Sequence, residues 1–198
     1  LSLLILVLVI WFLITYTRVK PTIVGTSTTH AAITANFQRK TFYANGYHWI
    51  FYCNGSHILY TTSSDASNWR VPTLIRAGIS SSGISIWYDG NVHYAYASGA
   101  PGNSVVYRRG SILGDRIEWE EGERTASAGV AGYEYYNAYV TVDSHGYSWV
   151  SYLQDNGTYR SSYAVKSTLT DGSTWSTPVR ISEPTNTKFW RTSILPLN

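Results

Sequence analysis

The chain has few of the residues from which disulfide frameworks, zinc clusters and nucleic-acid-binding surfaces are built. It contains a single cysteine, Cys53, which excludes an internal disulfide framework and argues against a zinc cluster. Its five histidines show no metal-ligand spacing, so we expect no bound metal and no other cofactor. Charged residues make up only 14%, and the 15 lysines and arginines are scattered, which excludes the basic stripe of a nucleic-acid-binding protein.

Methionine is absent, and the chain begins at Leu1 within an apolar run, LSLLILVLVIWFLITY, that the basic TRVK follows directly. The run is shorter than the roughly 20 residues that a membrane-spanning helix needs. We therefore expect that the chain begins partway into a longer product and that residues 1–17 form a hydrophobic helix that anchors it in a membrane. A cleaved signal segment, with HAA at His30–Ala32 as the nearest cleavage site, and a buried core helix are the alternatives. Either membrane interpretation predicts an extracellular or cell-surface protein.

Aromatic residues, by contrast, are abundant. The 17 tyrosines and 8 tryptophans favour β-strands, and no window after the N-terminal run shows a helical period. Residues 18–38 are rich in small and hydroxylated side chains and are interpreted as a linker. From about residue 39, short alternating segments recur, and Asn45-Gly46 and Asn54-Gly55 stand between them as two-residue hairpin turns would. The sequence therefore predicts an all-β fold of antiparallel strands.

Tryptophans that follow polar, turn-like stretches recur at Trp69, Trp119 and Trp175, spaced 50 and 56 residues apart. Upstream of each lies the same order of parts: a strand and a turn, an aromatic second strand, a loop, a third strand and the polar turn. A short fourth strand follows each tryptophan. Four strands in a unit of about 50 residues are typical of a β-propeller blade. We therefore predict three four-stranded blades and the first strand of a fourth, at about 39–78, 79–128, 129–183 and 184–198.

The segment STLTDGSTW, Ser167–Trp175, is similar to the Asp-box, the bacterial-neuraminidase (BNR) repeat of sialidase-like propellers. SSDASNW resembles a second copy in which Ser67 stands at the glycine position, and GDRIEW resembles a degenerate third. In this family the box is a structural turn: the aspartate caps backbone amides, the glycine allows a positive φ, and the aromatic ring packs between sheets. The resemblance thus assigns structural rather than catalytic roles to Asp65, Trp69, Trp119, Asp171, Gly172 and Trp175.

The predicted blades are fewer than a closed ring needs. Sialidase-like propellers have six blades, so the resemblance implies that this chain is roughly the N-terminal half of a longer protein. An arc of three blades exposes two blade faces. Self-association, in which two chains complete one ring or a subunit adds to an assembly, is therefore the alternative.

The family topology places the loops that enter each first strand on one face of the ring, opposite the Asp-boxes. The resemblance implies a substrate site in which aromatic side chains stack on a pyranose ring and arginines bind the carboxylate of an acidic sugar. Sialidases use a tyrosine nucleophile assisted by a glutamate. On this basis the candidate catalytic residues are Glu134, Tyr135 and Tyr136, and the candidate substrate-binding residues are Arg39, Lys40, Tyr133, Trp190 and Arg191.

The match to the family is incomplete at these positions. Its Phe-Arg-Ile-Pro motif has no counterpart, although QRKT offers Arg39 at a similar place. Glu134 and Tyr135 are adjacent, and adjacent residues on a strand point to opposite sides. Solvated surface arginines and a strand edge with aromatic packing are therefore the alternative interpretations.

Two sequons, Asn54-Gly55-Ser56 and Asn156-Gly157-Thr158, fall in equivalent loops between second and third strands. In an exported protein Asn54 and Asn156 are glycosylation sites. Simple hairpin turns are the alternative.

Three functions are compatible with these features. The first is an exported, membrane-tethered, sialidase-like propeller that recognises carbohydrate on its loop face. The second is an active exo-glycosidase of the sialidase type. The third is a structural or adhesive surface protein, such as a filament subunit.

Overall fold

The computed structural model describes residues 22–29, 32–33, 38–79, 83–97, 104–182 and 192–196. The hydrophobic helix predicted at 1–17 and most of the strand predicted after residue 184 lie outside these ranges. Within them every regular element is a β-strand, and no helix is long and apolar enough to cross a membrane. The described part of the chain is therefore all-β, as the sequence predicts.

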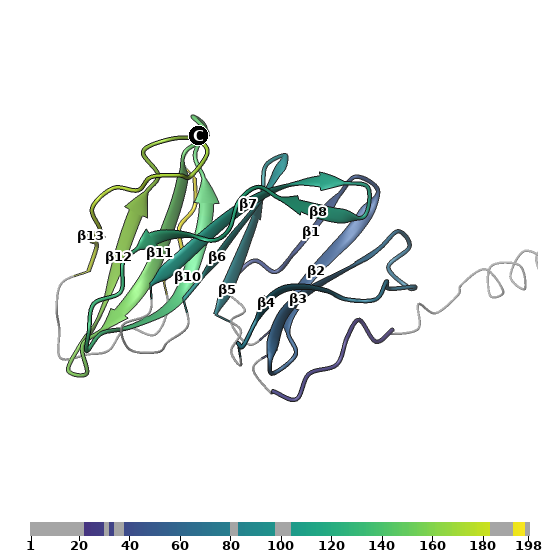
Figure 1. Ribbon diagram of the computed structural model, residues 1–198, viewed down its shortest axis with the longest axis horizontal. Coiled ribbons are helices and arrows are strands. Elements are labelled where there is room, and N and C mark those ends of the chain that lie inside the picture. Colours follow the sequence, from purple (N-terminus) through teal and green to yellow (C-terminus); the bar gives the residue numbers. More distant parts are fainter. Residues whose placement is uncertain are drawn as a thin grey trace, which may run out of the picture.

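Two of the three sheets are four-stranded and antiparallel, with their strands in chain order (Figure 1). Blade 1 contains β1 (Thr41–Ala44), β2 (Tyr47–Cys53), β3 (His57–Ser63) and β4 (Thr73–Ala77). Blade 3 contains β10 (Glu134–Val142), β11 (Ser148–Asp155), β12 (Arg160–Lys166) and β13 (Val179–Arg180). These sheets confirm the predicted meander of four antiparallel strands.

Blade 2 departs from this plan because it has five strands. They are β5 (Ile84–Tyr88), β6 (Asn91–Tyr96), β7 (Val105–Leu113), β8 (Arg116–Trp119) and β9 (Arg124–Ser127). The long strand β7 pairs with β8 at one end and with β9 at the other. It turns at Gly114, which has a φ of 64°, and Trp119 then pairs with Gly110. The interpretation of GDRIEW as a degenerate third Asp-box that ends at Trp119 is therefore wrong, since a β-hairpin occupies this place.

The two Asn-Gly pairs form different turns. At Asn45-Gly46 both residues have a positive φ, 52° and 79°, which is the two-residue hairpin turn that the sequence predicts. At Asn54 the loop between β2 and β3 is longer, because Asn54 Oδ1 accepts hydrogen bonds from the backbone N–H groups of Ser56 (3.0 Å) and His57 (2.8 Å). The prediction of a two-residue turn at Asn54 is therefore wrong.

Buried hydrophobic side chains, many of them aromatic, fill the spaces between neighbouring blades, which lie side by side in Figure 1. The cluster between blades 1 and 2 includes Trp49, Phe51, Ile84 and Tyr94. The cluster between blades 2 and 3 includes Val105, Tyr107, Tyr135 and Tyr152. The high tyrosine and tryptophan content is thus used largely to join one sheet to the next.

The loops between third and fourth strands in blades 1 and 3 are each built around an aspartate, and we call them capping turns. Asp65 Oδ1 accepts hydrogen bonds from the backbone N–H groups of Asn68 (2.7 Å) and Ser67 (2.8 Å). Asp171 Oδ1 accepts one from the N–H of Ser173 (2.9 Å). These bonds stabilise the ionised carboxylate, and the bond from Asn68 contributes most to holding the pKa of Asp65 well below its usual range.

The residue after each of these aspartates has a left-handed backbone. The φ is 56° at Ala66 and 70° at Gly172. Ala66, and not Ser67, therefore stands at the position equivalent to the glycine, which corrects the alignment made from the sequence.

Candidate functional site

Glu134 and Tyr136 form a hydrogen-bonded pair at the start of β10. Alternate residues of a strand project from the same face, so these two side chains point one way and Tyr135 points the other way. The Tyr136 hydroxyl donates a hydrogen bond to Glu134 Oε2. Both side chains are partly exposed, so a ligand can reach them. The structure thus brings together two of the three candidate catalytic residues.

A buried ion pair supports the Tyr136 ring. Asp155 lies opposite Glu134 in the register between β10 and β11 and is only 4% exposed. Arg160 donates from Nε (3.1 Å) and Nη2 (2.9 Å) to Asp155 Oδ2, and its guanidinium lies 4.6 Å from the centroid of the Tyr136 ring. The ion pair therefore fixes a cation against this aromatic face. We call Glu134, Tyr136, Asp155 and Arg160 the loop-end cluster.

Asp155 and Arg160 were not among the residues predicted from the sequence. They flank the loop that carries the Asn156 sequon, and the hairpin register pairs them directly. An acidic and a basic residue at the two ends of a short loop between strands is the signal that predicts such a pair.

The surroundings keep the Tyr136 hydroxyl protonated. Burial raises the pKa of Tyr136 to about 12, and the hydrogen bond to Glu134 and the charge of that carboxylate act in the same direction. At neutral pH the hydroxyl is therefore a hydrogen-bond donor. Any reaction with Tyr136 as the nucleophile requires Glu134 to accept its proton.

Tyr135 belongs to the core between blades 2 and 3 rather than to the site. Its side chain is buried, and its hydroxyl accepts hydrogen bonds from the backbone N–H of Val130 (3.2 Å) and from Gln154 Nε2 (3.3 Å). Its ring packs 5.8 Å from that of Tyr152. The interpretation of Tyr135 as a catalytic residue is therefore corrected to a packing role.

Lys40, a predicted substrate-binding residue, links blades. Its side chain is 7% exposed, and Nζ donates to Gln38 Oε1 (3.0 Å) and to the Ile84 carbonyl oxygen of blade 2 (2.9 Å). Gln38 Nε2 in turn donates to the Ala138 carbonyl oxygen of blade 3 (2.7 Å). Burial lowers the pKa of the Lys40 amine to about 7. The Lys40 amine therefore has partners within the protein, and because Lys40 also lines a cavity with Gln38, Thr41 and Tyr52, its contact with substrate stays a prediction.

Arg39 is exposed and lies over an aromatic ring, with its guanidinium 4.1 Å from the centroid of Trp87. The bond between Gln38 and Ala138 places this segment beside the bulge of β10 that follows Tyr136. Arg39 packs on Trp87 of blade 2 and not on the loop-end cluster, so among the described residues it does not join Glu134 and Tyr136.

The other predicted positions fall in different places. Tyr133 is partly exposed and packs against the core between blades 2 and 3, whereas Trp190 and Arg191 lie outside the described residues. Asn54 and Asn156 occupy equivalent loops, and each Oδ1 accepts bonds from the N–H groups two and three residues later. Their glycosylation stays a prediction. Among the residues that the structure describes, no three His, Cys, Asp or Glu side chains are grouped to hold a metal ion.

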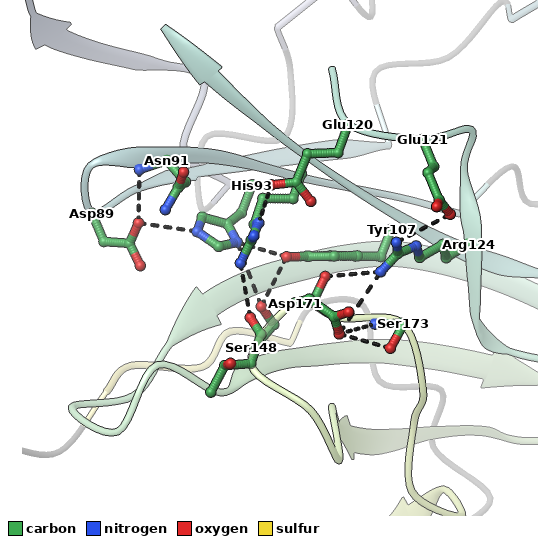
Figure 2. A network of polar contacts seen from close by, with 12 residues as sticks. Asp89, Asn91, His93, Tyr107, Glu120, Glu121, Arg124, Ser148, Asp171 and Ser173 are labelled. Atoms are coloured by element: carbon green, nitrogen blue, oxygen red, sulfur yellow. Dashed lines mark hydrogen bonds and ion pairs between the residues drawn. The ribbon is translucent and has the colours of Figure 1, made fainter. Parts of the chain in front are cut away.

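A polar network joins blades 2 and 3 (Figure 2). His93 Nε2 lies 3.0 Å from Asp89 Oδ1, and His93 Nδ1 lies 2.7 Å from the Tyr107 hydroxyl. Ser148 of blade 3 donates to the same hydroxyl at 3.0 Å. This carboxylate, imidazole and hydroxyl series contains the groups of a hydrolytic triad, but His93 is 2% exposed and Ser148 is fully buried. The network therefore connects blades and offers no access to a substrate.

Two arginines of blade 2 hold the capping turn of blade 3. Arg109 Nη1 donates to the Thr170 carbonyl oxygen (3.0 Å), and Arg124 Nη1 donates to the Asp171 carbonyl oxygen (2.9 Å). Figure 2 shows Arg124 and Asp171 facing each other across this interface. The capping turn of blade 3 is therefore a docking element between blades.

The tryptophans of the two capping turns have different partners. The Trp175 ring packs edge-on against Tyr107 of blade 2, with 5.0 Å between the ring centroids. Trp69 Nε1 donates to Thr22 Oγ1 (3.2 Å), which lies in the segment before blade 1. Each tryptophan thus joins its turn to a neighbouring part of the chain.

Comparisons with known proteins identify the fold. No protein-family model matches the sequence, and no curated protein matches it. Among solved structures, an endo-arabinase from Bacteroides thetaiotaomicron VPI-5482 is similar with a TM-score of 0.56 and 11% identity, over 82% of this chain and 60% of that one. A thermostable family-43 glycoside hydrolase has a TM-score of 0.50 and 7% identity, over 82% and 57% of the two chains. This chain thus spans less than two thirds of either neighbour. At such identities the likeness shows the fold alone, a β-propeller, and it does not single out the sialidase-like propellers.

Proposed function

We propose that this chain is a carbohydrate-recognising propeller whose loop-end cluster contacts the sugar. The observation that carries the proposal is the hydrogen-bonded pair of Glu134 and Tyr136 with Arg160 packed on the tyrosine ring. We further propose that the protein lies outside the cell and that residues 1–17 tether it to a membrane, which their apolar sequence supports.

The chemistry of the loop-end cluster suits a sugar. The Glu134 carboxylate accepts hydrogen bonds from hydroxyl groups, and the Tyr136 side chain combines an aromatic face with a polar edge. Arg160 is already engaged by Asp155, so the accessible groups favour hydroxyls over an anionic substituent. Two neighbours with this fold are named as an endo-arabinase and a family-43 glycoside hydrolase, which supports a carbohydrate ligand.

Two tyrosine-to-phenylalanine variants test this proposal, because one is expected to change glycan affinity and the other only stability. Tyr136→Phe removes a hydroxyl from the loop-end cluster and is expected to weaken glycan affinity roughly three- to ten-fold, the effect of one neutral hydrogen bond. Tyr135→Phe removes the buried acceptor of the Val130 N–H and is expected to leave affinity unchanged but lower the free energy of unfolding by about 1 kcal/mol. Glycan-array binding, followed by titration calorimetry and urea unfolding, measures both. If no glycan binds, or if both variants weaken binding equally, the proposal fails.

The contact between Tyr136 and Glu134 also favours a second function, glycoside cleavage. In that reaction the Tyr136 oxygen bonds to the anomeric carbon while its proton passes to Glu134, and the bond to the leaving-group oxygen breaks. Water then attacks the anomeric carbon and loses a proton to the solvent, the bond to the Tyr136 oxygen breaks, and the proton on Glu134 returns to that oxygen. Aryl glycosides with a good leaving group need no general acid and therefore test this step directly. We expect a panel of fluorogenic glycosides that includes a sialoside to yield turnover that Glu134→Gln and Tyr136→Phe each abolish. Absence of turnover across the panel removes the enzymatic interpretation and leaves recognition intact.

A further inference from the structure

A cavity of about 320 Å³ opens at the other end of blade 3, beside the turn between β10 and β11. Thr141, Asp143, Ser144, His145 and Trp149 line one part of it, and Ile194–Pro196 line another. Thr141 stands seven residues along β10 from Glu134, which is roughly 20 Å of strand. The cavity is therefore separate from the loop-end cluster.

The Thr141 hydroxyl has an unmet hydrogen-bonding capacity. Thr141 is 1% exposed, and within the described part of the chain its Oγ1 has no hydrogen-bond partner. A buried hydroxyl without a partner is destabilising, and a ligand or water in the cavity supplies the missing bond if the Thr141 side chain rotates to expose Oγ1. This is the feature of the cavity that points to an occupant.

Trp149 is held in place by an ion pair. Its Nε1 donates to Asp143 Oδ2 (2.9 Å), and Lys166 Nζ lies 3.2 Å from the same oxygen. Asp143 Oδ1 also accepts the backbone N–H groups of His145 and Tyr147, each at 3.0 Å. The indole is therefore oriented before any ligand arrives, and the charges of Asp143 and Lys166 compensate each other. The wall of the cavity thus combines an ordered aromatic side chain with no net charge.

We propose that this cavity binds one neutral pyranose unit of a glycan. Trp149 and the Ile194–Pro196 segment would pack against the apolar face of the ring. Thr141, Ser144 and His145 supply hydroxyl and imidazole groups for the sugar hydroxyls. A neutral ligand of mixed polar and apolar surface matches this lining better than an ion or a purely apolar molecule. The chain then has a sugar-binding site at each end of blade 3.

Ligand-observed saturation-transfer NMR of the full chain with methyl glycosides of glucose, galactose, xylose and arabinose tests the proposal. At least one glycoside is expected to bind in a saturable way, and Thr141→Val is expected to weaken it roughly three- to ten-fold through the loss of one hydrogen bond. Ser151→Ala is the matched control, because Ser151 Oγ is also buried without a partner but does not line the cavity. It should leave the affinity unchanged.

The proposed function and this site can fail independently. Tyr136→Phe alters the loop-end cluster only and should not change binding in the cavity, and Thr141→Val should not change binding at the loop-end cluster. Thr141→Val and Ser151→Ala each remove an unpaired hydroxyl, so the midpoint temperature of thermal unfolding of each variant should equal or exceed that of the wild type. The cavity proposal is overturned if no glycoside binds in a saturable way, or if Thr141→Val binds the glycoside with the same affinity as the wild type.

Discussion

Replacement of Gly172 with alanine is expected to lower the free energy of unfolding by about 3 kcal/mol. Gly172 has a φ of 70°, a conformation that costs alanine about 1 kcal/mol. A Cβ at this position would lie only 2.3 Å from Cε1 of the Tyr107 ring. Overpacking of this kind typically costs about 1–3 kcal/mol. Guanidinium unfolding of the full chain, followed by tryptophan fluorescence, measures the loss.

The Tyr107 ring cannot easily move away from the added methyl group. It is fully buried, and its hydroxyl is bonded to His93 (2.7 Å) and Ser148 (3.0 Å). Gly46→Ala is the matched control, because Gly46 has a similar φ of 79° but no atom within 4 Å of its Cβ position. The free energy of unfolding of Gly46→Ala should fall only by the backbone cost of about 1 kcal/mol. Equal losses in the two variants would show that the contact between Gly172 and Tyr107 does not hold blade 3 against blade 2.

The fold was predictable where local signals decide it. Each blade is a meander of neighbouring strands, so turn residues such as Asn45-Gly46 and alternating aromatic side chains specify it over short distances. The hairpin between β7 and β8 was not predictable in this way. Gly114-Asp115 suits a capping turn and a hairpin equally, and only the pairing of Gly110 with Trp119 distinguishes them.

The candidate site was predictable only in part, for a related reason. Glu134 and Tyr136 share a strand face, a relation that the spacing of two residues contains. Asp155 joins them through the register of β10 with β11, which the sequence of either strand alone does not specify. The burial of Lys40 depends on Ile84 and on the bond between Gln38 and Ala138, 100 residues apart. Contacts at that separation are set by how whole blades pack.

Replacement of Lys40 with methionine is expected to change the pH dependence of stability. Burial lowers the pKa of the amine from 10.5 in the unfolded chain to about 7 in the folded protein. Between these values the unfolded chain binds more protons, so the Lys40 contribution to stability rises with pH. Below about pH 7 the amine is charged in both states and its burial imposes the full cost. From about pH 6.5 to about pH 9.5 the wild type should gain about 3 kcal/mol relative to Lys40→Met.

Urea unfolding of both proteins across this range measures the gain. The variant also loses the hydrogen bonds to Gln38 and Ile84, which are stronger when the amine is charged; this difference is part of the folded-state pKa and needs no separate correction. Titration of the other groups is common to both proteins and cancels from the difference between them. Lys166→Met is the matched control, since this lysine is partly exposed and lies 3.2 Å from the Asp143 carboxylate, so its removal takes away no desolvated amine. A difference between wild type and Lys40→Met that stays constant with pH would mean that water or an anion reaches the amine. Lys40 would then be a stronger candidate for contact with a ligand in the cavity that it lines.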